Sequence, residues 1–335
     1  MTAVRRSSFF LLLIAALVLG CDSAGDAMTE PPPVTEEGWR RVSGVPASFM
    51  ETMLVAGDTL TVGGQGRVYQ TTGSGRWTAS APVPDGYEIA TLLRADGRLF
   101  AGTYRGGVVE AVDDGTGWRE WNEGLRGDAA KTVPAMAVRD GSLIVGTDGA
   151  SLFRRSLTDP GATWQPFRTG IPSTISWNTS ALVRVGDRLV AGAGANGLVY
   201  LNGRDEEPWR GVSYDPTLGT FLQMHDLFDT GTSLLGGGTY RLYRSTDAGE
   251  TWRPYDLNVG PIGSVRFARD GGTLVALAAK PTGLYLFASG DDGRTWRRVA
   301  DQPGVQAFDV AVYDDRLYVA RTDGLWSIPT DEILD

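Results

Sequence analysis

The sequence predicts an all-β fold, a seven-bladed propeller of four-stranded sheets, because two periodic markers run through it. The first marker is a tryptophan that begins a short extended segment. It recurs with gaps of 38, 41, 46, 45, 43 and 44 residues, at Trp39, Trp77, Trp118, Trp164, Trp209, Trp252 and Trp296. Self-similarity at such a period indicates a repeat architecture.

The second marker keeps step with the first. It is a tight-turn pair followed by a strand with a leucine, as in Asp96-Gly97-Arg98-Leu99 and Asp140-Gly141-Ser142-Leu143. The same leucine recurs at Leu60, Leu189, Leu234, Leu274 and Leu317. Such turn pairs supply the positive φ angles of hairpins, and alternating apolar residues on either side indicate two paired strands.

A third strand, such as 66–69 or 283–287, and the tryptophan strand complete each unit. Four strands in about 43 residues is the size of a propeller blade, and no helical periodicity of useful length competes with this interpretation.

The turn before the tryptophan strand carries a motif. Residues 245–252 read Ser-Thr-Asp-Ala-Gly-Glu-Thr-Trp and residues 289–296 read Ser-Gly-Asp-Asp-Gly-Arg-Thr-Trp. Both resemble the Asp-box of bacterial sialidase repeats, S-x-D-x-G-x-T-W, and residues 156–164 resemble it with one residue inserted. We expect a structural role, because a short carboxylate accepts backbone N–H groups, glycine adopts a positive φ and the indole packs between sheets. The residues concerned are Asp159, Trp164, Asp247, Gly249, Trp252, Asp291, Gly293 and Trp296.

The ends of the repeat region predict how the ring closes. The last unit has three strands, 308–328, and no tryptophan strand, whereas the segment that begins at Trp39 has no preceding partners. Pairing the two completes a seventh blade and removes exposed sheet edges. We therefore expect one propeller domain over residues 38–330, with six blades as the alternative if the Trp209 unit is an insertion.

The first 20 residues are typical of a secretion signal. A basic start with Arg5 and Arg6 precedes an apolar run of 11 residues, 9–19, which is shorter than the ~20 needed to span a bilayer as a helix. Residues 18–21 resemble a bacterial lipobox, which implies a diacylglycerol on Cys21 after cleavage. The resemblance implies a lipoprotein of the bacterial cell envelope that is anchored to a membrane on its extracytoplasmic side. It does not distinguish the inner from the outer membrane. Residues 21–37, rich in proline and acids, are typical of a disordered tether.

Charge and composition narrow the partners. The formal charge is −9 and becomes −11 when Arg5 and Arg6 are removed, so nucleic acid is not an expected partner. With one cysteine and one histidine we expect no disulfide, metal or cofactor, and we expect a monomer.

Candidate binding residues come from the loops that gather around a propeller's channel on one face. Four long segments enter blades there, 122–134, 169–180, 213–226 and 256–263, and shorter turns carry the similar sequences Gly-Thr-Tyr-Arg at 102–105 and 238–241. Aromatic and arginine side chains on such loops can stack a sugar ring or hold a peptide. The candidates are Trp177, Tyr104, Arg105, Tyr240, Arg241 and His225.

The Asp-box resemblance leaves the activity open. Sialidases need three clustered arginines, a Tyr-Glu nucleophile pair and an aspartic acid, and their Arg-Ile-Pro signature is absent, since residues 42–46 read Val-Ser-Gly-Val-Pro. Single seven-bladed Asp-box propellers of the photosystem II assembly factor type bind proteins without catalysis, and sortilin-type receptors share the box. Our first hypothesis is a non-catalytic envelope lipoprotein that binds a protein or glycan. The alternatives are an exo-glycosidase of the sialidase-like group and an assembly factor for a membrane complex.

Overall fold

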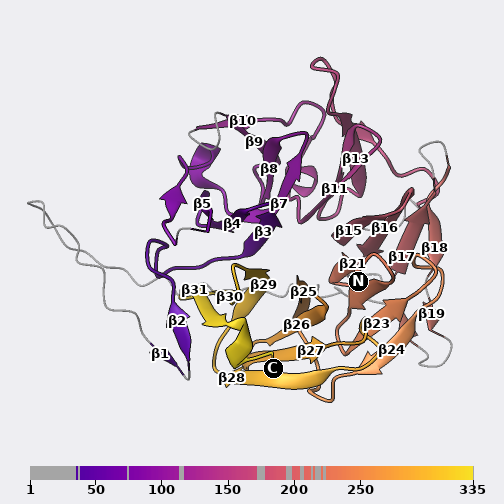
Figure 1. The fold of residues 1–335 in the computed structure, drawn as a ribbon. Helices are drawn as coiled ribbons and strands as arrows, with labels where there is room; N and C mark the ends of the chain where they lie inside the picture. Colours follow the sequence, from indigo (N-terminus) through magenta and orange to yellow (C-terminus); the bar gives the residue numbers. More distant parts are fainter. Residues whose placement is uncertain are drawn as a thin grey trace, which may run out of the picture. The chain divides into compact units, whose positions relative to one another are not determined.

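Seven four-stranded antiparallel sheets form a ring in the computed structural model of the chain (Figure 1). The structure describes residues 35–36, 38–73, 75–112, 117–171, 178–193, 198–203, 207–212, 214–215, 220–221 and 224–334. The predicted seven-bladed propeller is confirmed and the six-bladed alternative is wrong, because the Trp209 unit forms a blade of its own. Cys21 and Trp177 lie outside the described residues.

Each blade places its strands in chain order from the axis outward. Blade 1 contains β3 (Thr52–Ala56), β4 (Thr59–Gly64), β5 (Arg67–Thr71) and β6 (Thr78–Ala79). Blade 2 contains β7 (Ile89–Ala95), β8 (Arg98–Thr103), β9 (Val108–Val112) and β10 (Gly117–Glu120). Blade 3 contains β11 (Ala135–Arg139), β12 (Ser142–Gly146), β13 (Leu152–Ser156) and β14 (Gln165–Pro166).

The next three blades repeat the pattern. Blade 4 contains β15 (Thr179–Val185), β16 (Arg188–Ala193), β17 (Leu198–Asn202) and β18 (Arg210–Val212). Blade 5 contains β21 (Asp226–Asp229), β22 (Leu234–Gly237), β23 (Arg241–Ser245) and β24 (Arg253–Asp256). Blade 6 contains β25 (Ser264–Asp270), β26 (Thr273–Lys280), β27 (Gly283–Ser289) and β28 (Arg297–Pro303).

Blade 7 joins the two ends of the domain. It contains β29 (Ala307–Tyr313), β30 (Arg316–Arg321), β31 (Gly324–Pro329) and, from the start of the domain, β2 (Trp39–Arg41), which pairs with β31. Trp39 is 3% exposed and packs in the core of this blade, so the predicted closure is present. A fifth strand, β1 (Thr35–Glu36), pairs with β2 and falls within the segment expected to be tether.

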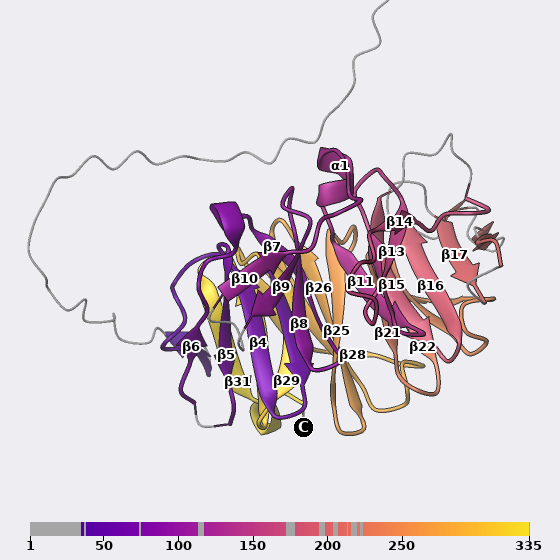
Figure 2. The same cartoon turned by 90° about the horizontal axis from the view of Figure 1, so that it is seen from above.

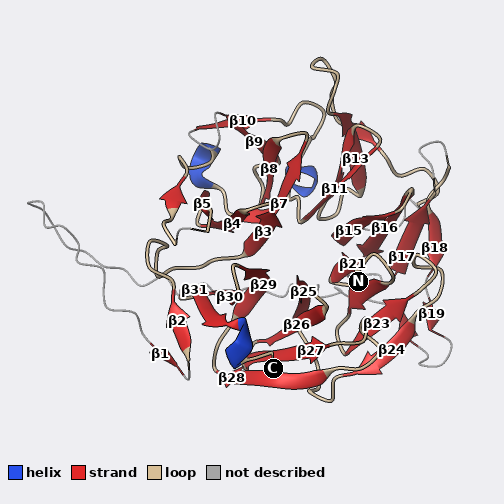
Figure 3. Ribbon diagram, viewed as in Figure 1, coloured by secondary structure: helices blue, strands red, loops and turns tan. Residues whose placement is uncertain are grey.

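Helix is scarce among the described residues (Figure 3). A short helix, α1 (Asp128–Lys131), leads into blade 3, and 3-10 turns occupy η1 (Pro84–Gly86) and η3 (Thr330–Glu332). The hairpin of β19 (Tyr214–Asp215) and β20 (Thr220–Phe221) precedes blade 5. Within the described ranges, no helix is long and apolar enough to cross a membrane.

Glycines let neighbouring blades approach near the axis. A Cβ on Gly102 of blade 2 would lie 2.4 Å from the carbonyl oxygen of Val133, which leads into blade 3. A Cβ on Gly237 of blade 5 would lie 2.3 Å from the Cβ of Val265 in blade 6. Any side chain at these positions would push the inner strands apart.

In blades 2, 3 and 4 the indole of the tryptophan strand bonds to the preceding blade, whereas Trp252 of blade 5 donates to Gly249 within its own Asp-box. Trp118 donates its Nε1–H to the carbonyl of Ala81 at 3.0 Å, and Trp209 donates to the carbonyl of Phe167 at 2.9 Å. In both pairs the acceptor lies in the segment that leaves the previous blade. A buried indole N–H needs such a partner, and here the partner also fixes the spacing of two sheets.

The Asp-box turns are held by hydrogen bonds within the box. Asp291 accepts from the backbone N–H and the hydroxyl of Thr295, at 2.9 and 2.7 Å, and Ser289 accepts the N–H of Gly293 at 2.9 Å. Asp247 accepts from Thr251 in the same way. In the eroded turn of blade 1, which has no such aspartate, the hydroxyl of Thr71 is buried without a partner.

Candidate functional site: the axial cavity

A cavity of about 220 Å³ lies on the axis of the ring and is lined by residues at the innermost strands of all seven blades. Figure 1 shows these strands, β3, β7, β11, β15, β21, β25 and β29, arranged around the centre of the ring. We call this cavity the axial cavity. The strand positions that face it are equivalent, because each pairs with the same position of the second strand of its blade. In blade order these seven lining residues are Thr52, Thr91, Ala135, Ala181, Asp226, Arg266 and Asp309.

The charged residues among these seven positions lie in three consecutive blades. Blades 1 to 4 contribute threonine or alanine, whereas blades 5 to 7 contribute Asp226, Arg266 and Asp309 in succession. All three charged side chains are half-buried. Charges on one wall of a narrow cavity are poorly screened by solvent, so the wall can orient a charged or polar ligand.

Each aspartate accepts backbone N–H groups from its own strand and the neighbouring blade. Asp309 accepts the N–H of Met53 in blade 1 at 2.6 Å and that of Val310 at 2.9 Å. Asp226 accepts the N–H of Leu227 at 3.0 Å and also that of Phe267 in blade 6. These carboxylates therefore connect adjacent inner strands around the axis.

Arg266 lies between the two aspartates without pairing directly to either. Its Nη1 donates to the carbonyls of His225 at 3.2 Å and Val265 at 3.1 Å. In the described part of the chain, no carboxylate oxygen lies within 4.0 Å of its guanidinium nitrogens. Arg266 therefore interacts with Asp226 and Asp309 electrostatically at longer range and not through a direct ion pair.

A second group of side chains surrounds the end of the cavity where the inner strands begin. Glu51 precedes β3, and its Oε1 accepts a short hydrogen bond from the hydroxyl of Tyr104 in the β8–β9 turn. Its Oε2 is buried and has no hydrogen-bond partner. His225 precedes β21, and its Nε2 lies 3.0 Å from the hydroxyl of Thr239. The blade-entering segments and the second-to-third-strand turns thus meet here, and we call this side of the ring the channel face.

Burial changes the titration of these groups. Burial raises the pKa of Glu51 to about 7, and the hydrogen bond from Tyr104 only partly offsets the rise. Burial likewise raises the pKa of Asp309 to about 7 and that of Asp226 to about 6, although Arg266 opposes both shifts. Burial, reinforced by Arg266, lowers the pKa of His225. The carboxyl groups are therefore partly protonated near neutral pH.

Tyr104 is the opposite of an activated phenol. Burial raises its pKa, and the neighbouring Glu51 carboxylate raises it further, so the hydroxyl remains a hydrogen-bond donor. Among the residues described, no group of three or more His, Cys, Asp or Glu is arranged to hold a metal ion. The arrangement is suited to ionic and hydrogen-bonded recognition.

Of the sequence-predicted residues, Tyr104 and His225 do not line the axial cavity but contact residues that do: Tyr104 donates to Glu51, and the carbonyl of His225 accepts from Arg266. Tyr240 follows Thr239 on the same face and is 61% exposed. Arg241 is directed to Asp256, with Nε 3.6 Å from its carboxylate, and contributes nothing to the cavity. The backbone N–H of Arg105 donates to the hydroxyl of Thr132. A ligand role for any of them stays a prediction.

Sequence reasoning missed Glu51, Asp226, Arg266 and Asp309. The signal for three of them was present, since a charge replaces the threonine or alanine found at the same strand position in the other blades. Glu51 carries no such signal, because its partner Tyr104 is 53 residues away.

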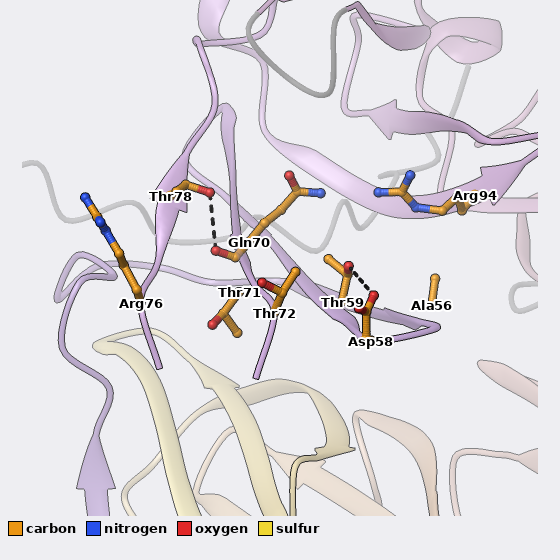
Figure 4. A pocket seen from close by; sticks show the side chains of 9 residues that line it. All are labelled: Ala56, Asp58, Thr59, Gln70, Thr71, Thr72, Arg76, Thr78 and Arg94. Carbon is orange, nitrogen blue, oxygen red and sulfur yellow. Dashed lines mark hydrogen bonds between the residues drawn. The ribbon is translucent and has the colours of Figure 1, made fainter. Parts of the chain in front are cut away.

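A larger cavity, about 550 Å³, lies at the other end of blade 1, beside the β3–β4 turn (Figure 4). Its hydroxyl groups bond locally, from Thr59 to Asp58 and from Thr78 to the carbonyl of Gln70. The side chain of Arg94 points toward Gln70, whereas that of Arg76 points away. Its charged groups do not converge, so the cavity favours no ligand class.

A third cavity, about 320 Å³, is lined by outer parts of blades 2 and 3. It contains three arginines, but Arg98 and Arg119 share the carboxylate of Glu110, and Arg155 pairs with Glu123 at 3.0 Å. The guanidinium of Arg155 also stacks over Trp121, 4.0 Å from the ring centroid. None of its lining residues contributes to the axial cavity.

Comparisons with known proteins show the fold. No family model matches the chain, and no curated protein matches it. YCF48 from Cyanidioschyzon merolae superposes with a TM-score of 0.64 at 14% identity, covering 88% of this chain and all of that one. YCF48 bound to D1 peptide has a TM-score of 0.62 at 16% identity, covering 90% of this chain and 96% of that one.

A bacterial extracellular domain is similar as well. The extracellular domain of the putative one component system BT4673 from B. thetaiotaomicron has a TM-score of 0.66 at 13% identity, with 87% of this chain covered. This chain spans only 40% of that domain's length. At such identities the similarity shows a shared propeller fold alone.

Proposed function

We propose that this chain is a non-catalytic cell-envelope lipoprotein, anchored through Cys21, that binds a protein or glycan partner on the channel face of its propeller. The observation that carries the proposal is that Glu51, which is bonded to Tyr104, and Arg266, which is bonded to the carbonyl of His225, both line the axial cavity. Loops on a rigid scaffold with recessed charges and an exposed aromatic residue suit recognition of a partner.

The similar structures support a protein partner. One solved neighbour is YCF48 bound to D1 peptide, and another is the extracellular domain of a putative sensor. Both give precedent for an extracytoplasmic or protein-binding role on this fold. An assembly factor for a membrane complex is a special case of the same proposal.

A pull-down from detergent-solubilised membranes tests the proposal. We expect the full-length chain to capture a partner, and we expect Tyr240→Ala to reduce capture, because this residue is the most exposed aromatic among the described residues of the channel face. Asp187→Ala, in the turn at the opposite end of β15, is the matched surface control. Capture that is unchanged by Tyr240→Ala and abolished by Asp187→Ala would contradict the proposal. Binding on a glycan array would instead identify a sugar ligand.

One observation favours a second candidate, an exo-glycosidase of the sialidase-like group. Tyr104 and Glu51 form a Tyr-Glu pair beside the axial cavity. Against it, Arg266 is the one arginine that lines this cavity in the described residues, and the raised pKa of Tyr104 opposes a nucleophilic role. Hydrolysis of aryl glycosides or sialosides that Glu51→Gln abolishes would establish this candidate.

A further inference from the structure

We propose that the axial cavity receives the cationic side chain, lysine or arginine, of a protein partner, and that Glu51 and Asp309 hold its charged group. The inference rests on the proposed function, because it specifies which chemistry the channel face selects in its partner. It concerns the interior of the cavity, whereas the proposed function requires only the face around it.

Acidic side chains outnumber basic ones in the described lining of the axial cavity. Among the residues that the structure describes, Glu51, Asp226, Asp309 and a single guanidinium, that of Arg266, line the cavity, and the exposed Glu88 adds a fourth acid near Glu51. When these carboxyl groups are ionised, their negative charge exceeds the one positive charge of Arg266, and an entering cation would favour their ionised form. A second cation entering the cavity would be attracted by the excess.

Glu51 offers a hydrogen-bond acceptor that no described residue uses. Oε2 of Glu51 is buried and accepts no hydrogen bond, although its Oε1 is bonded to Tyr104. An unsatisfied buried carboxylate oxygen costs free energy that an N–H donor from a ligand would recover. Asp309 lines the same cavity as Glu51 and the two carboxylates act on each other electrostatically, so both attract an ammonium or guanidinium group that enters it.

The volume of the axial cavity and the exposure of Tyr104 at its rim allow a side chain to enter. The volume of about 220 Å³ greatly exceeds the 10–15 Å³ that a single water needs, so the cavity has room for an extended side chain. Tyr104 remains 38% exposed at the rim, beside the Glu51 carboxylate. Its ring offers an apolar and cation-attracting surface for the methylene groups of an entering lysine or for a guanidinium.

The same observations disfavour other ligands. An anion would meet three carboxylates for one arginine. A metal ion would need several clustered ligands, which the described residues do not provide. A neutral sugar would leave the charge excess uncompensated.

Titration calorimetry of the full-length chain with a blocked Gly-Lys-Gly tripeptide tests the inference. The control ligand is the same peptide with norleucine, which keeps the methylene chain and lacks the charge. We expect saturable binding of the lysine peptide with a dissociation constant on the order of 1 mM, and at least about tenfold weaker binding of the norleucine peptide.

Two variants of the protein locate the binding. Glu51→Gln removes the charge and retains an acceptor for Tyr104. Asp309→Asn removes the charge but keeps one acceptor oxygen for two backbone N–H groups, those of Met53 and Val310, so it also removes one hydrogen bond. Each should weaken lysine-peptide binding about tenfold or more, whereas Asp187→Asn, a 98% exposed aspartate remote from the cavity, should not. Circular dichroism establishes that every variant is folded.

Equal binding of the two peptides, no saturable binding, or binding that both cavity variants leave unchanged would overturn the inference. Partner capture that survives Glu51→Gln and Asp309→Asn would likewise overturn it while the proposed function stands. Conversely, lysine-peptide binding without any captured partner or glycan would contradict the proposed function alone.

Discussion

At the scale of single residues, burial raises the pKa of acidic side chains, and the hydrogen bonds that they accept decide whether the net shift is upward or downward. In the Asp-box, burial pushes the pKa of Asp291 upward, but the hydrogen bonds from Thr295 and Ser289 prevail and lower it to about 2. In the axial cavity, burial prevails and raises the pKa of Glu51 to about 7. One aspartate is stabilised as a charged structural group, whereas the glutamate is left short of partners.

The raised pKa of Glu51 predicts a specific pH dependence. Its contribution to the free energy of unfolding is complete below its ordinary value of 4.5 and is lost as the pH rises through about 7. Asp309 and Asp226 act in the same direction, whereas His225, with its lowered pKa, acts in the opposite one. We expect Glu51→Gln to become more stable relative to wild type as the pH increases from about 4.5 to about 7.

Thermal unfolding of the two proteins across that range measures the difference. Subtracting the two curves removes the contribution of His225, which both proteins retain. A difference that does not change with pH would mean that Glu51 titrates as an ordinary exposed glutamate.

Asp291→Ala tests the structural role of the Asp-box. The substitution removes the acceptor of two Thr295 hydrogen bonds, and we expect it to lower the free energy of unfolding by about 1–2 kcal/mol. Urea unfolding compares it with Asp187→Ala, whose aspartate is 98% exposed and should matter little. Equal effects of the two substitutions would refute the role.

At the scale of elements, the contacts between neighbouring inner strands depend on glycines of the second strands. Gly102→Ala places a Cβ 2.4 Å from the Val133 carbonyl oxygen, so β8 or β11 must shift. We expect a loss of about 1–3 kcal/mol in unfolding free energy.

Gly117→Ala is the matched control, because Gly117 also lies in a strand and its Cβ would meet nothing within 4 Å. Chemical denaturation of both variants provides the measurement. If Gly102→Ala is as stable as Gly117→Ala, the tight approach of blades 2 and 3 is not required for the ring.

The strands were predictable because each unit repeats its signals. Turn pairs, alternating apolar residues and the tryptophan all act within one blade, so local patterns are sufficient. β1 was not predicted, since its two residues lie in a proline-rich acidic stretch and are ordered by pairing with β2. Strand pairing outweighed local composition there.

At the scale of the whole molecule, closure of the ring creates the candidate site. Figure 2 shows the blades edge-on, with the inner strands β7, β11, β15, β21 and β25 among those at the centre. The axial cavity exists only because seven inner strands meet, and its charged wall comes from three consecutive blades. The sequence predicted the ring and its closure by β2. It did not predict the contact of Glu51 with Tyr104, which depends on the angle between blades 1 and 2 and not on any local pattern.

The central claim is that the channel face meets the partner. A photo-crosslinking amino acid at Tyr240, on that face, and one at Asp187, at the opposite end of the ring, compare the two faces of the full-length chain in native membranes. The account predicts one discrete adduct from position 240 and none from position 187. An adduct confined to position 187 would contradict it.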